Sequence, residues 1–365
     1  MKPFNVIFLL KVFIILFAKQ LYAQQNLTFG RYESRAIFKK SNDPNCFAPI
    51  VILVPGSGAN GPEEMVPASA TSDNRDHSIF NAFSEGLHKG HAGTLSIGKP
   101  GVEFFKTWDK SKWFYNQTLF ANLQWQDLIN NLKDAVALAK TLPCVNPKRI
   151  VVLAHSEGTQ VAIDFAHQNP YEVSDFILVG FAGESLAVTL DWQFFRRPID
   201  AWLKPDVDIN RDNFISKVEV EQWPEFQWNW KPQQTIVSLI EIEQALRADV
   251  SLLKKYKEFS LTPLWKNVFN RPAIYSDAAR LKQNIYVFTG ALDVQTRPEE
   301  SLNLQTECRR KNKANCWVHI VPGLGHAMSE PKGLRKQKLI DATLGPVSPN
   351  FLKLLESIAK QFFQN

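Results

Sequence analysis

Most of this 365-residue sequence lacks a long apolar span, a cluster of basic residues and an internal repeat. No run of 20 apolar residues lies beyond residue 23, so we expect no integral membrane span once a leader is removed. The lysines and arginines are scattered, which argues against nucleic acid as a partner. With 45% hydrophobic residues, the chain can form one large core with an insertion, or two domains.

Cysteine is also scarce. The chain has four cysteines, and their spacing fits no usual zinc pattern, so a zinc site is not expected. An even number fits an exported protein with disulfides, but four cysteines allow three pairings, which spacing alone does not separate. The four are Cys46, Cys144, Cys308 and Cys316.

The first 23 residues differ from the rest of the chain. Lys2 opens the segment, an apolar run follows, and "LYA" ends at Ala23, which is the layout of a cleavable secretory signal. Lys11 interrupts the run, and an uncleaved anchor is the alternative. This segment holds three lysines and no acidic residue, so the net charge of +6 becomes about +3 without it (6 − 3). We predict an exported protein, secreted or periplasmic.

Apolar strands alternate with amphipathic helices over much of the chain. This alternation predicts an α/β fold with a mostly parallel central sheet and helices on both of its faces. His319 lies inside the last strand and is expected to be buried. The expected strands are 48–58, 93–101, 149–156, 173–183, 283–293 and 316–326, and the expected helices are 77–90, 123–142, 157–170 and 348–363.

Residues 184–278 break this alternation. They hold six of the ten tryptophans, and we expect them to form a cap inserted between two parts of the core, 24–183 and 279–365. Two interpretations of the tryptophans remain open: they bind an apolar or aromatic acyl group, or they form a small core within the cap. The six are Trp192, Trp202, Trp223, Trp228, Trp230 and Trp265.

The expected strand "RIVVLAHS" runs directly into the expected helix "EGTQVAIDFAH". The tight turn between them lifts the Ser156 side chain above the carboxyl edge of the sheet, and the small residues Ala154 and Gly158 let strand and helix approach. This is the nucleophile-elbow pattern with Ala in place of its first Gly. The backbone N–H of Glu157 then points to where an oxyanion would form. An ordinary serine in a strand–helix turn is the alternative.

A nucleophilic serine needs a base, an acid that orients the base, and a second oxyanion donor. His326 follows a strand in the Gly-rich loop "PGLGHAM", and Asp293 follows the preceding strand in "ALDVQT". The order Ser, Asp, His is that of the α/β-hydrolase arrangement. Glu184 competes with Asp293 for the acid role. The second donor is expected in "PGSG", at the N–H of Ser57 or of its neighbour Gly58.

These features together resemble the α/β-hydrolase superfamily. Within it, the chain is similar to secreted or periplasmic carboxylesterase-type enzymes that carry "PGSG" after the third strand and "HSEG" at the elbow. The tail "TLGPVSPNFLKLLESIAKQF" is also similar to theirs, and the resemblance covers the two core parts. It implies that Ser156, Asp293 and His326 form a catalytic triad that needs no cofactor. One departure is "ANGPEEMVP" where the family often has a Pro-x-Asp-Arg-Asp stretch.

This fold suggests how the cysteines pair, with free buried thiols as the alternative. The strands 48–58 and 149–156 are neighbours in it, and one cysteine precedes each of them at the same end of the sheet. The other two flank the short link between a helix and the last strand. The expected bonds are Cys46–Cys144 and Cys308–Cys316.

The stretch "DINRDNFISKVE", residues 208–219, resembles an EF-hand calcium loop. Oxygen-bearing residues alternate along it, Ile215 stands at the apolar eighth position, and Asn213 replaces the usual Gly at a position that needs a left-handed backbone. We expect a single structural Ca²⁺ clip in the cap, with a polar surface turn as the alternative. The expected ligands are Asp208, Asn210, Asp212, the carbonyl of Phe214, Ser216 and Glu219.

The expected function is therefore a serine hydrolase that cleaves a small-molecule carboxylic ester through an acyl-enzyme intermediate. Thioesters, lactones and small peptides would suit the same three residues. The alternative is a non-catalytic protein that binds a ligand on a hydrolase fold. Against the alternative, a binding protein has no need to retain Ser, Asp and His together.

Overall fold

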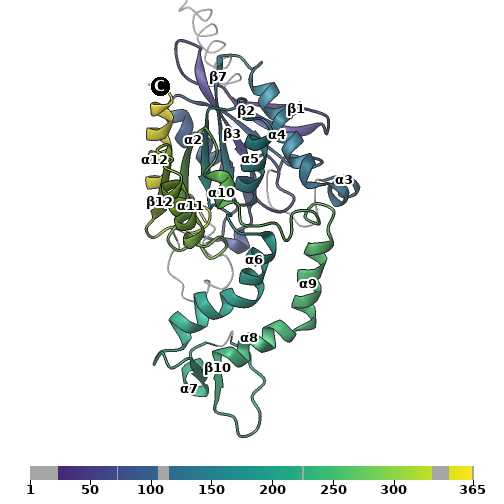
Figure 1. Ribbon diagram of the computed structural model, residues 1–365, viewed down its shortest axis with the longest axis vertical. Helices are drawn as coiled ribbons and strands as arrows, with labels where there is room; N and C mark the ends of the chain where they lie inside the picture. Colours follow the sequence, from purple (N-terminus) through teal and green to yellow (C-terminus); the bar gives the residue numbers. More distant parts are fainter. Residues whose placement is uncertain (1–23, 72, 106–114, 224–225, 331–344, 364–365) are drawn as a thin grey trace, which may run out of the picture.

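The computed structural model describes residues 24–71, 73–105, 115–223, 226–330 and 345–363 (Figure 1). The expected signal segment, residues 1–23, lies outside these ranges. Among the described residues, no helix is long and apolar enough to cross a membrane.

An eight-stranded sheet forms the centre of the molecule. Its strands run, from one edge to the other, in the order β1 (Gln24–Phe29), β2 (Ser34–Lys39), β6 (Gly93–Ile97), β3 (Ala48–Val54), β7 (Val145–His155), β8 (Asp175–Val179), β11 (Asn284–Gly290) and β12 (Cys316–Val321). All pairs from β6 to β12 are parallel, whereas β1 and β2 pair antiparallel with their neighbours. The expected mostly parallel sheet is therefore confirmed.

Successive side chains of the central strands belong to two different hydrophobic cores, one on each face of the sheet. In β3, Ile50 and Ile52 belong to one apolar cluster, whereas Val51 and Leu53 belong to the other. This follows from the two-residue period of a strand, which places neighbours on opposite faces. Helices α4 (Trp125–Ala139) and α5 (Glu157–Gln168) cover the first face, and α2 (Ile79–Lys89) and α12 (Pro349–Gln361) cover the second (Figure 1).

Two of the remaining helical stretches, Val250–Leu261 and Pro298–Arg310, are similar in length to these four, and the others are shorter. The remaining stretches are η1 (Ala68–Ala70), α3 (Gln117–Asn122), α6 (Leu186–Asp191), η2 (Trp192–Arg196), η3 (Ile199–Val207), α7 (Lys217–Val220), α8 (Leu239–Ala248), α9 (Val250–Leu261), α10 (Tyr275–Ala278) and α11 (Pro298–Arg310). Two further pairs of short strands form small sheets of their own: β4 (Met65–Val66) with β5 (His77–Ser78), and β9 (Phe214–Ser216) with β10 (Ile236–Ser238).

One burial expectation is wrong. His319 is exposed rather than buried, because β12 is an edge strand with one uncovered side. Its ring stacks on Phe288 of β11, with ring centroids 5.2 Å apart. The strands β1 and β2 were not expected either. β1 alternates exposed and half-buried residues and β2 is mostly buried, but neither contains the continuous apolar run that marks a central strand in the sequence.

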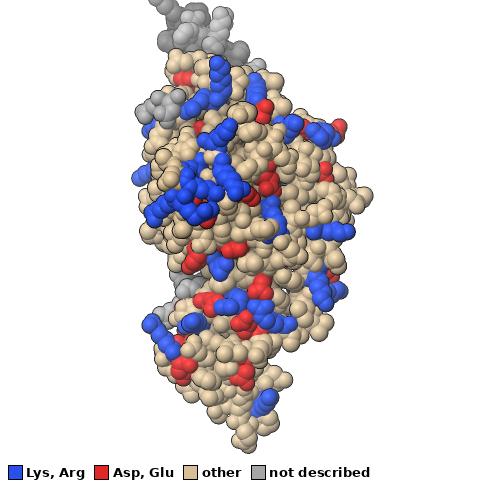
Figure 2. Space-filling view, viewed as in Figure 1, with Lys and Arg blue, Asp and Glu red and all other residues tan. Residues whose placement is uncertain are grey.

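Residues 184–278 contribute no strand to the main sheet and project beyond its carboxyl edge (Figure 1). Part of this inserted segment has a core of its own, built around Trp202, Trp223 and Ile215. Trp228 and Trp230 pack against that cluster. Trp265 instead joins the main core beside the sheet. Four of the six tryptophans therefore form or border a small core within the inserted segment. On the face shown in Figure 2, acidic and basic side chains are mixed over this segment.

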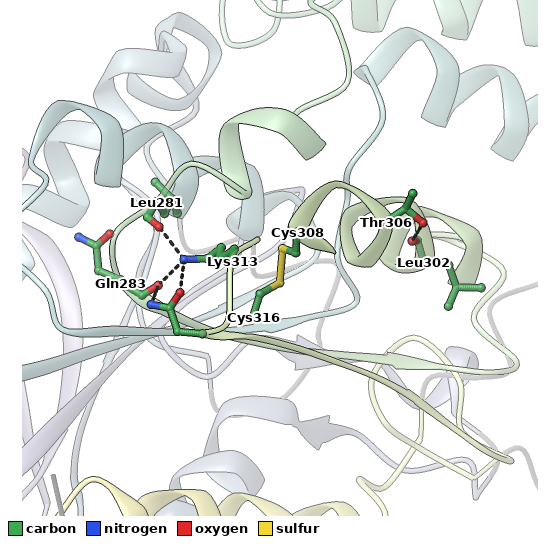
Figure 3. Close-up of a disulfide and its surroundings, with 8 residues drawn as sticks. Leu281, Gln283, Leu302, Thr306, Cys308, Lys313 and Cys316 are labelled. Atoms are coloured by element: carbon green, nitrogen blue, oxygen red, sulfur yellow. Dashed lines mark hydrogen bonds between the residues drawn. A yellow bond between two sulfur atoms is a disulfide. The ribbon is translucent and has the colours of Figure 1, made fainter. Parts of the chain in front are cut away.

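The structure contains both expected disulfides. Cys46–Cys144 joins the approaches to β3 and β7, which are neighbours in the sheet with Ile50 opposite Ile150. Cys308–Cys316 ties the end of α11 to the start of β12 (Figure 3). Beside it, the Lys313 ammonium donates to the carbonyls of Leu281 and Gln283 at 2.6 and 2.9 Å. The turn between α11 and β12 is therefore held both by the disulfide and by these hydrogen bonds.

We expect the two disulfides to stabilise the fold unequally. Cys46 and Cys144 are 98 residues apart, whereas Cys308 and Cys316 are only 8 apart. A cross-link restricts the unfolded chain more when its loop is longer, by about 4.7 kcal/mol for a loop of 100 residues and about 3 kcal/mol for one of 15. Chemical denaturation of the two double Cys→Ala variants should show the larger loss of unfolding free energy for the first pair. Equal losses would contradict this chain-entropy account.

Candidate active site

Ser156 occupies a strained turn between β7 and α5. Its backbone has φ 54° and ψ −125°, outside the regions that a non-glycine residue prefers. Its N–H donates to the Val179 carbonyl of β8 at 2.9 Å, which helps to hold the turn in place. A side chain at Gly158 would lie 2.7 Å from the Val54 carbonyl oxygen, so only glycine lets α5 approach β3 this closely. The sharp turn expected from the sequence is present.

Asp293 and His326 lie side by side at the same edge of the sheet. The Nδ1 atom of His326 is 2.8 Å from Oδ2 of Asp293, and both residues are buried. The Asp293 carboxylate also accepts the backbone N–H groups of Gln295 and Thr296 at 2.8 and 3.0 Å. The Thr296 hydroxyl donates to Oδ2 at 2.9 Å. These donors fix the carboxylate, so it can orient the imidazole ring.

Glu184 takes no part in this arrangement. Its carboxylate accepts the Tyr275 hydroxyl at 2.8 Å and holds part of the inserted segment instead. Glu300, 2% exposed, accepts the backbone N–H groups of Gly183 and Glu184 at 2.7 and 3.1 Å. The geometry therefore favours Asp293 over Glu184 as the partner of His326.

The expected oxyanion donors lie on either side of Ser156. Ser57 lines both pockets that contain Ser156. Glu157 is the first residue of α5, so its N–H has no acceptor four residues earlier in the helix. Gly58, the alternative to Ser57, lines one of the two pockets.

Sequence reasoning missed Gly180, which makes room for the base. This residue ends β8 with φ 59°, and a Cβ atom there would lie 2.9 Å from Cε1 of His326. Any side chain would thus displace the imidazole ring. The signal available in the sequence is the isolated glycine of "ILVGFAG" within the expected strand 173–183.

A second buried histidine stands beside the first. Nδ1 of His155 is 2.9 Å from Oε1 of Glu64, and its Nε2 is 3.3 Å from the carbonyl oxygen of His326. The same Glu64 oxygen accepts the Gly56 N–H at 2.7 Å. A ring that meets an acceptor at both nitrogens is best satisfied as the doubly protonated imidazolium. The Glu64–His155 pair therefore connects the loop of Ser57 to the loop of His326.

This pair should make stability depend on pH. Burial alone lowers the pKa of the His155 imidazole, but the charge of Glu64 and the hydrogen bond to it outweigh burial, so the pKa is raised above its ordinary value of about 6.5. The folded protein then binds a proton that the unfolded chain releases near pH 6.5. The stabilisation is complete below that pH and is lost as pH rises through the folded pKa.

Urea unfolding across a pH series checks this expectation. The unfolding free energy lost in His155→Gln should be larger at pH 6 than at pH 9. His167→Gln, at an exposed position on α5, is the matched control and should show no such trend. If the loss of unfolding free energy in His155→Gln is instead larger at pH 9 than at pH 6, the Glu64–His155 pair is not a charged pair.

Two pockets open on Ser156, and both are also lined by Ser57 and Gln295. The first, which we call the aromatic pocket, has a volume of about 250 Å³ and is lined by Trp125, Phe259 and Trp265 among others. The second, which we call the histidine pocket, has a volume of about 200 Å³ and is lined by His155 and His326 among others. The Ser156 side chain thus stands between two cavities.

A buried ion pair lies at the wall of the aromatic pocket that Glu157 lines. The Lys99 ammonium is 2.6 Å from Oε1 of Glu157, and the indole N–H of Trp265 donates to Oε2 at 2.8 Å. Lys99 and Glu157 are 3% and 8% exposed, so the charges are neutralised within the protein. This contact also joins the inserted segment to the residue that follows the elbow.

The loop 208–219 has a compact form closed by its own carboxylates. Asp208, 2% exposed, accepts the N–H groups of Asp212 and Asn213 at 3.1 and 2.9 Å, and Glu219 accepts the N–H of Ile209 at 3.1 Å. Asn213 has φ 66°, as a glycine position requires. In the described ranges, no three His, Cys, Asp or Glu side chains are arranged to hold a metal.

The loop is paired with a second stretch of the inserted segment, which the sequence did not predict. Its strand β9 pairs antiparallel with β10, and the buried Ile215 stands opposite the buried Val237. Each strand then enters a helix through the same reciprocal cap, in which Ser216 faces Glu219 and Ser238 faces Glu241. The pairing was missed because the second stretch, "WKPQQTIVSLIE", has no acidic residue before its final Glu.

Comparison with known proteins bears on the fold. No protein-family profile and no curated protein sequence matches the chain. Among solved structures, it resembles a puromycin-hydrolyzing peptidase of Mycobacterium tuberculosis at 12% identity and a TM-score of 0.53, covering 93% of this chain and 40% of the peptidase.

Two other structures are similar over nearly their whole length. Est1E from Butyrivibrio proteoclasticus matches at 11% identity and a TM-score of 0.47, covering 94% of this chain and 98% of Est1E. MGS-M2, an α/β hydrolase enzyme from a Medee basin deep-sea metagenome library, matches at 13% identity and a TM-score of 0.44, covering 93% and 98%. At such identities the likeness concerns the arrangement of the chain. With its mostly parallel sheet, the elbow after β7 and helices on both faces, this protein has the α/β-hydrolase fold.

Proposed function

We propose that the protein is a serine hydrolase that cleaves carboxylic esters. The observation that supports it most is the buried contact of 2.8 Å between His326 and Asp293, at the sheet edge where Ser156 projects. Ser156 and His326 also line the same pocket, which supports a triad of three residues that are far apart in the sequence. A ligand-binding protein would have no use for a fixed carboxylate behind the histidine.

The proposed reaction has two halves. The Ser156 hydroxyl oxygen attacks the ester carbonyl carbon while its proton passes to Nε2 of His326, and the N–H groups of Ser57 and Glu157 bind the resulting oxyanion. The carbon–oxygen bond to the alcohol then breaks, and the alcohol oxygen takes the proton from His326. A water molecule repeats the sequence on the acyl-enzyme, releases the acid and restores the serine. Asp293 stays ionised and stabilises the imidazolium throughout.

Turnover of p-nitrophenyl esters of increasing acyl length tests this proposal. A fast first release of p-nitrophenol, equal to one per enzyme, followed by slower steady turnover would reveal the acyl-enzyme. Folded protein that releases no p-nitrophenol above the uncatalysed rate from any ester of the series would favour the non-catalytic alternative.

We also propose that the protein is exported to the periplasm or beyond the cell. The support comes from its two disulfides, since such bonds form and persist in oxidising compartments and are rare in the cytosol. The apolar leader at residues 1–23 fits the same destination. Expression with the leader and assay of the periplasmic and culture fractions test this proposal.

We further propose that residues 208–219 bind one Ca²⁺ ion. Support comes from the spacing of Asp208, Asn210 and Asp212 and from the left-handed backbone at Asn213, which together make a tight oxygen-lined loop. The paired strand β10 braces the loop without offering a second set of acidic ligands. In this proposal, Glu219 exchanges its contacts with Ser216 and Ile209 for the ion.

Calcium binding should depend strongly on Glu219. Because this residue would supply two ligand oxygens, Glu219→Gln should weaken binding far more than Ser216→Ala, whose hydroxyl would act through water. Calcium should also raise the melting temperature, since it binds only the folded state. Calorimetric titration of chelator-treated protein checks both points, with Glu241→Gln in the second stretch as the matched control. If the titration shows no saturable heat and calcium does not shift the melting temperature, residues 208–219 form a polar turn and not a calcium site.

A further inference from the structure

The two pockets beside Ser156 are lined by different kinds of side chain. His326 and His155 line the histidine pocket, whereas neither lines the aromatic pocket. Only Ser57, Ser156 and Gln295 line both. An ester bound with its carbonyl carbon at Ser156 therefore has one space for its acid part and another for its alcohol part.

The position of the general acid decides which part goes where. During acylation the alcohol oxygen must receive a proton from His326, and such a donor has to lie within hydrogen-bond reach of that oxygen. The alcohol therefore leaves on the side where His326 stands, which is the histidine pocket. The acyl group remains bonded to Ser156 and therefore occupies the aromatic pocket.

The aromatic pocket suits a compact, uncharged, apolar group. Beyond its three aromatic residues its apolar lining includes Leu186, Leu190 and Val268, and Gln160, Thr189 and Gln193 add polar groups. Glu157 brings a charge to the wall, but Lys99 and the indole N–H of Trp265 already satisfy its two oxygens. Since a dry cavity of about 150 Å³ takes up benzene, the volume of about 250 Å³ found here fits an aromatic ring with a short linker.

The histidine pocket offers a free acceptor. Oε2 of Glu64 is buried and has no hydrogen-bond partner in the described part of the chain, although Oε1 is fully engaged. Glu64 lines this pocket together with Asn60. A buried carboxylate oxygen without a partner is costly, and a ligand hydroxyl would supply the missing donor.

We propose that the substrate is an ester of an aryl-alkyl acid with a small alcohol that carries a further hydroxyl group. The acid lies in the aromatic pocket under the inserted segment, and the alcohol lies in the histidine pocket against Glu64. This inference rests on the proposed ester hydrolysis and specifies its substrate class.

The acid side is tested with p-nitrophenyl 3-phenylpropanoate and p-nitrophenyl acetate. The wild-type protein should favour the aryl-alkyl ester in kcat/KM by roughly tenfold or more, the range in which apolar pockets discriminate. Val268→Phe narrows the aromatic pocket and should reduce that preference by a similar factor. Met65→Phe narrows the histidine pocket and is the matched control.

The rate of deacylation shows which of the two pockets holds the acyl group. The alcohol has left before this step and only a small water molecule takes its place beside His326, so changes around the acyl group should have the larger effect on the rate. Val268→Phe should change the single-turnover deacylation rate of the 3-phenylpropanoyl enzyme, and Met65→Phe should not. A deacylation rate that responds to Met65→Phe and not to Val268→Phe would overturn the assignment by reversing the pockets.

The alcohol side is tested with the methyl and 2-hydroxyethyl esters of 3-phenylpropanoic acid. A hydrogen bond to a buried carboxylate should favour the hydroxyethyl ester by roughly tenfold in kcat/KM. Equal rates, or a preference for acetyl over 3-phenylpropanoyl esters, would refute the substrate class while ester cleavage itself stands. Failure to cleave any ester of either set would overturn both this inference and the proposed function.

Discussion

Replacing Ser156 with alanine should abolish nearly all ester turnover while the fold is kept. Ser156 is the proposed nucleophile, and loss of that group in a serine hydrolase lowers kcat by about six orders of magnitude. The remaining activity would come from the oxyanion donors and substrate binding, which the variant retains. Steady-state kinetics with a p-nitrophenyl ester measure the loss, and circular dichroism with thermal melting checks the fold.

A glycine at the same position separates chemistry from backbone strain. Ser156 has φ 54° and ψ −125°, a conformation that costs a residue with a side chain about 1–3 kcal/mol. Ser156→Gly removes the nucleophile as Ser156→Ala does, but it also relieves that strain. Both variants should therefore be inactive, with the glycine variant at least as stable as the alanine one. Turnover in either variant close to that of the wild type would remove Ser156 from the mechanism.

Replacing Asp293 with asparagine should lower kcat by about four orders of magnitude. The carboxylate accepts from Nδ1 of His326 at 2.8 Å, which leaves Nε2 free to take the serine proton. An amide donates through its nitrogen and favours the wrong imidazole tautomer. Because the Gln295 and Thr296 N–H groups can still bond to the amide oxygen, the local turn should persist.

Glu184→Gln is the matched control for this experiment. Glu184 also follows a core strand, but its carboxylate bonds to the Tyr275 hydroxyl and not to the histidine. We expect a change in kcat within a few-fold, compared with the roughly 10⁴-fold loss at Asp293. A larger loss in Glu184→Gln than in Asp293→Asn would show that the acid has been assigned to the wrong residue.

The parts of the fold that local patterns determine could be predicted from the sequence. The buried strand β3 is a continuous apolar run, β7 contains one at 150–154, and Ala154 and Gly158 mark the elbow because small residues are needed there. The partner of each strand also followed from the fold class, and this placed Cys46 near Cys144.

Features that join distant segments were not visible in the sequence. The Glu64–His155 pair spans 91 residues, and the contact of Trp265 with Glu157 spans 108. A glutamate after "GP" or a tryptophan in a polar segment has no local pattern that indicates its partner. The exposure of His319 depends on β12 being the last strand of the sheet, which is a property of the whole fold.

Labelling with a small fluorophosphonate probe tests the central claim most directly. The probe reacts with a serine only when a neighbouring base activates it, so the reaction requires His326 and Asp293 to act on Ser156 as proposed. Peptide mass spectrometry of the folded wild-type protein should find a single phosphonylated residue, Ser156, and labelling should be slow in Asp293→Asn and absent in Ser156→Ala. Folded protein that remains unlabelled, or that is labelled at another residue, would contradict the account.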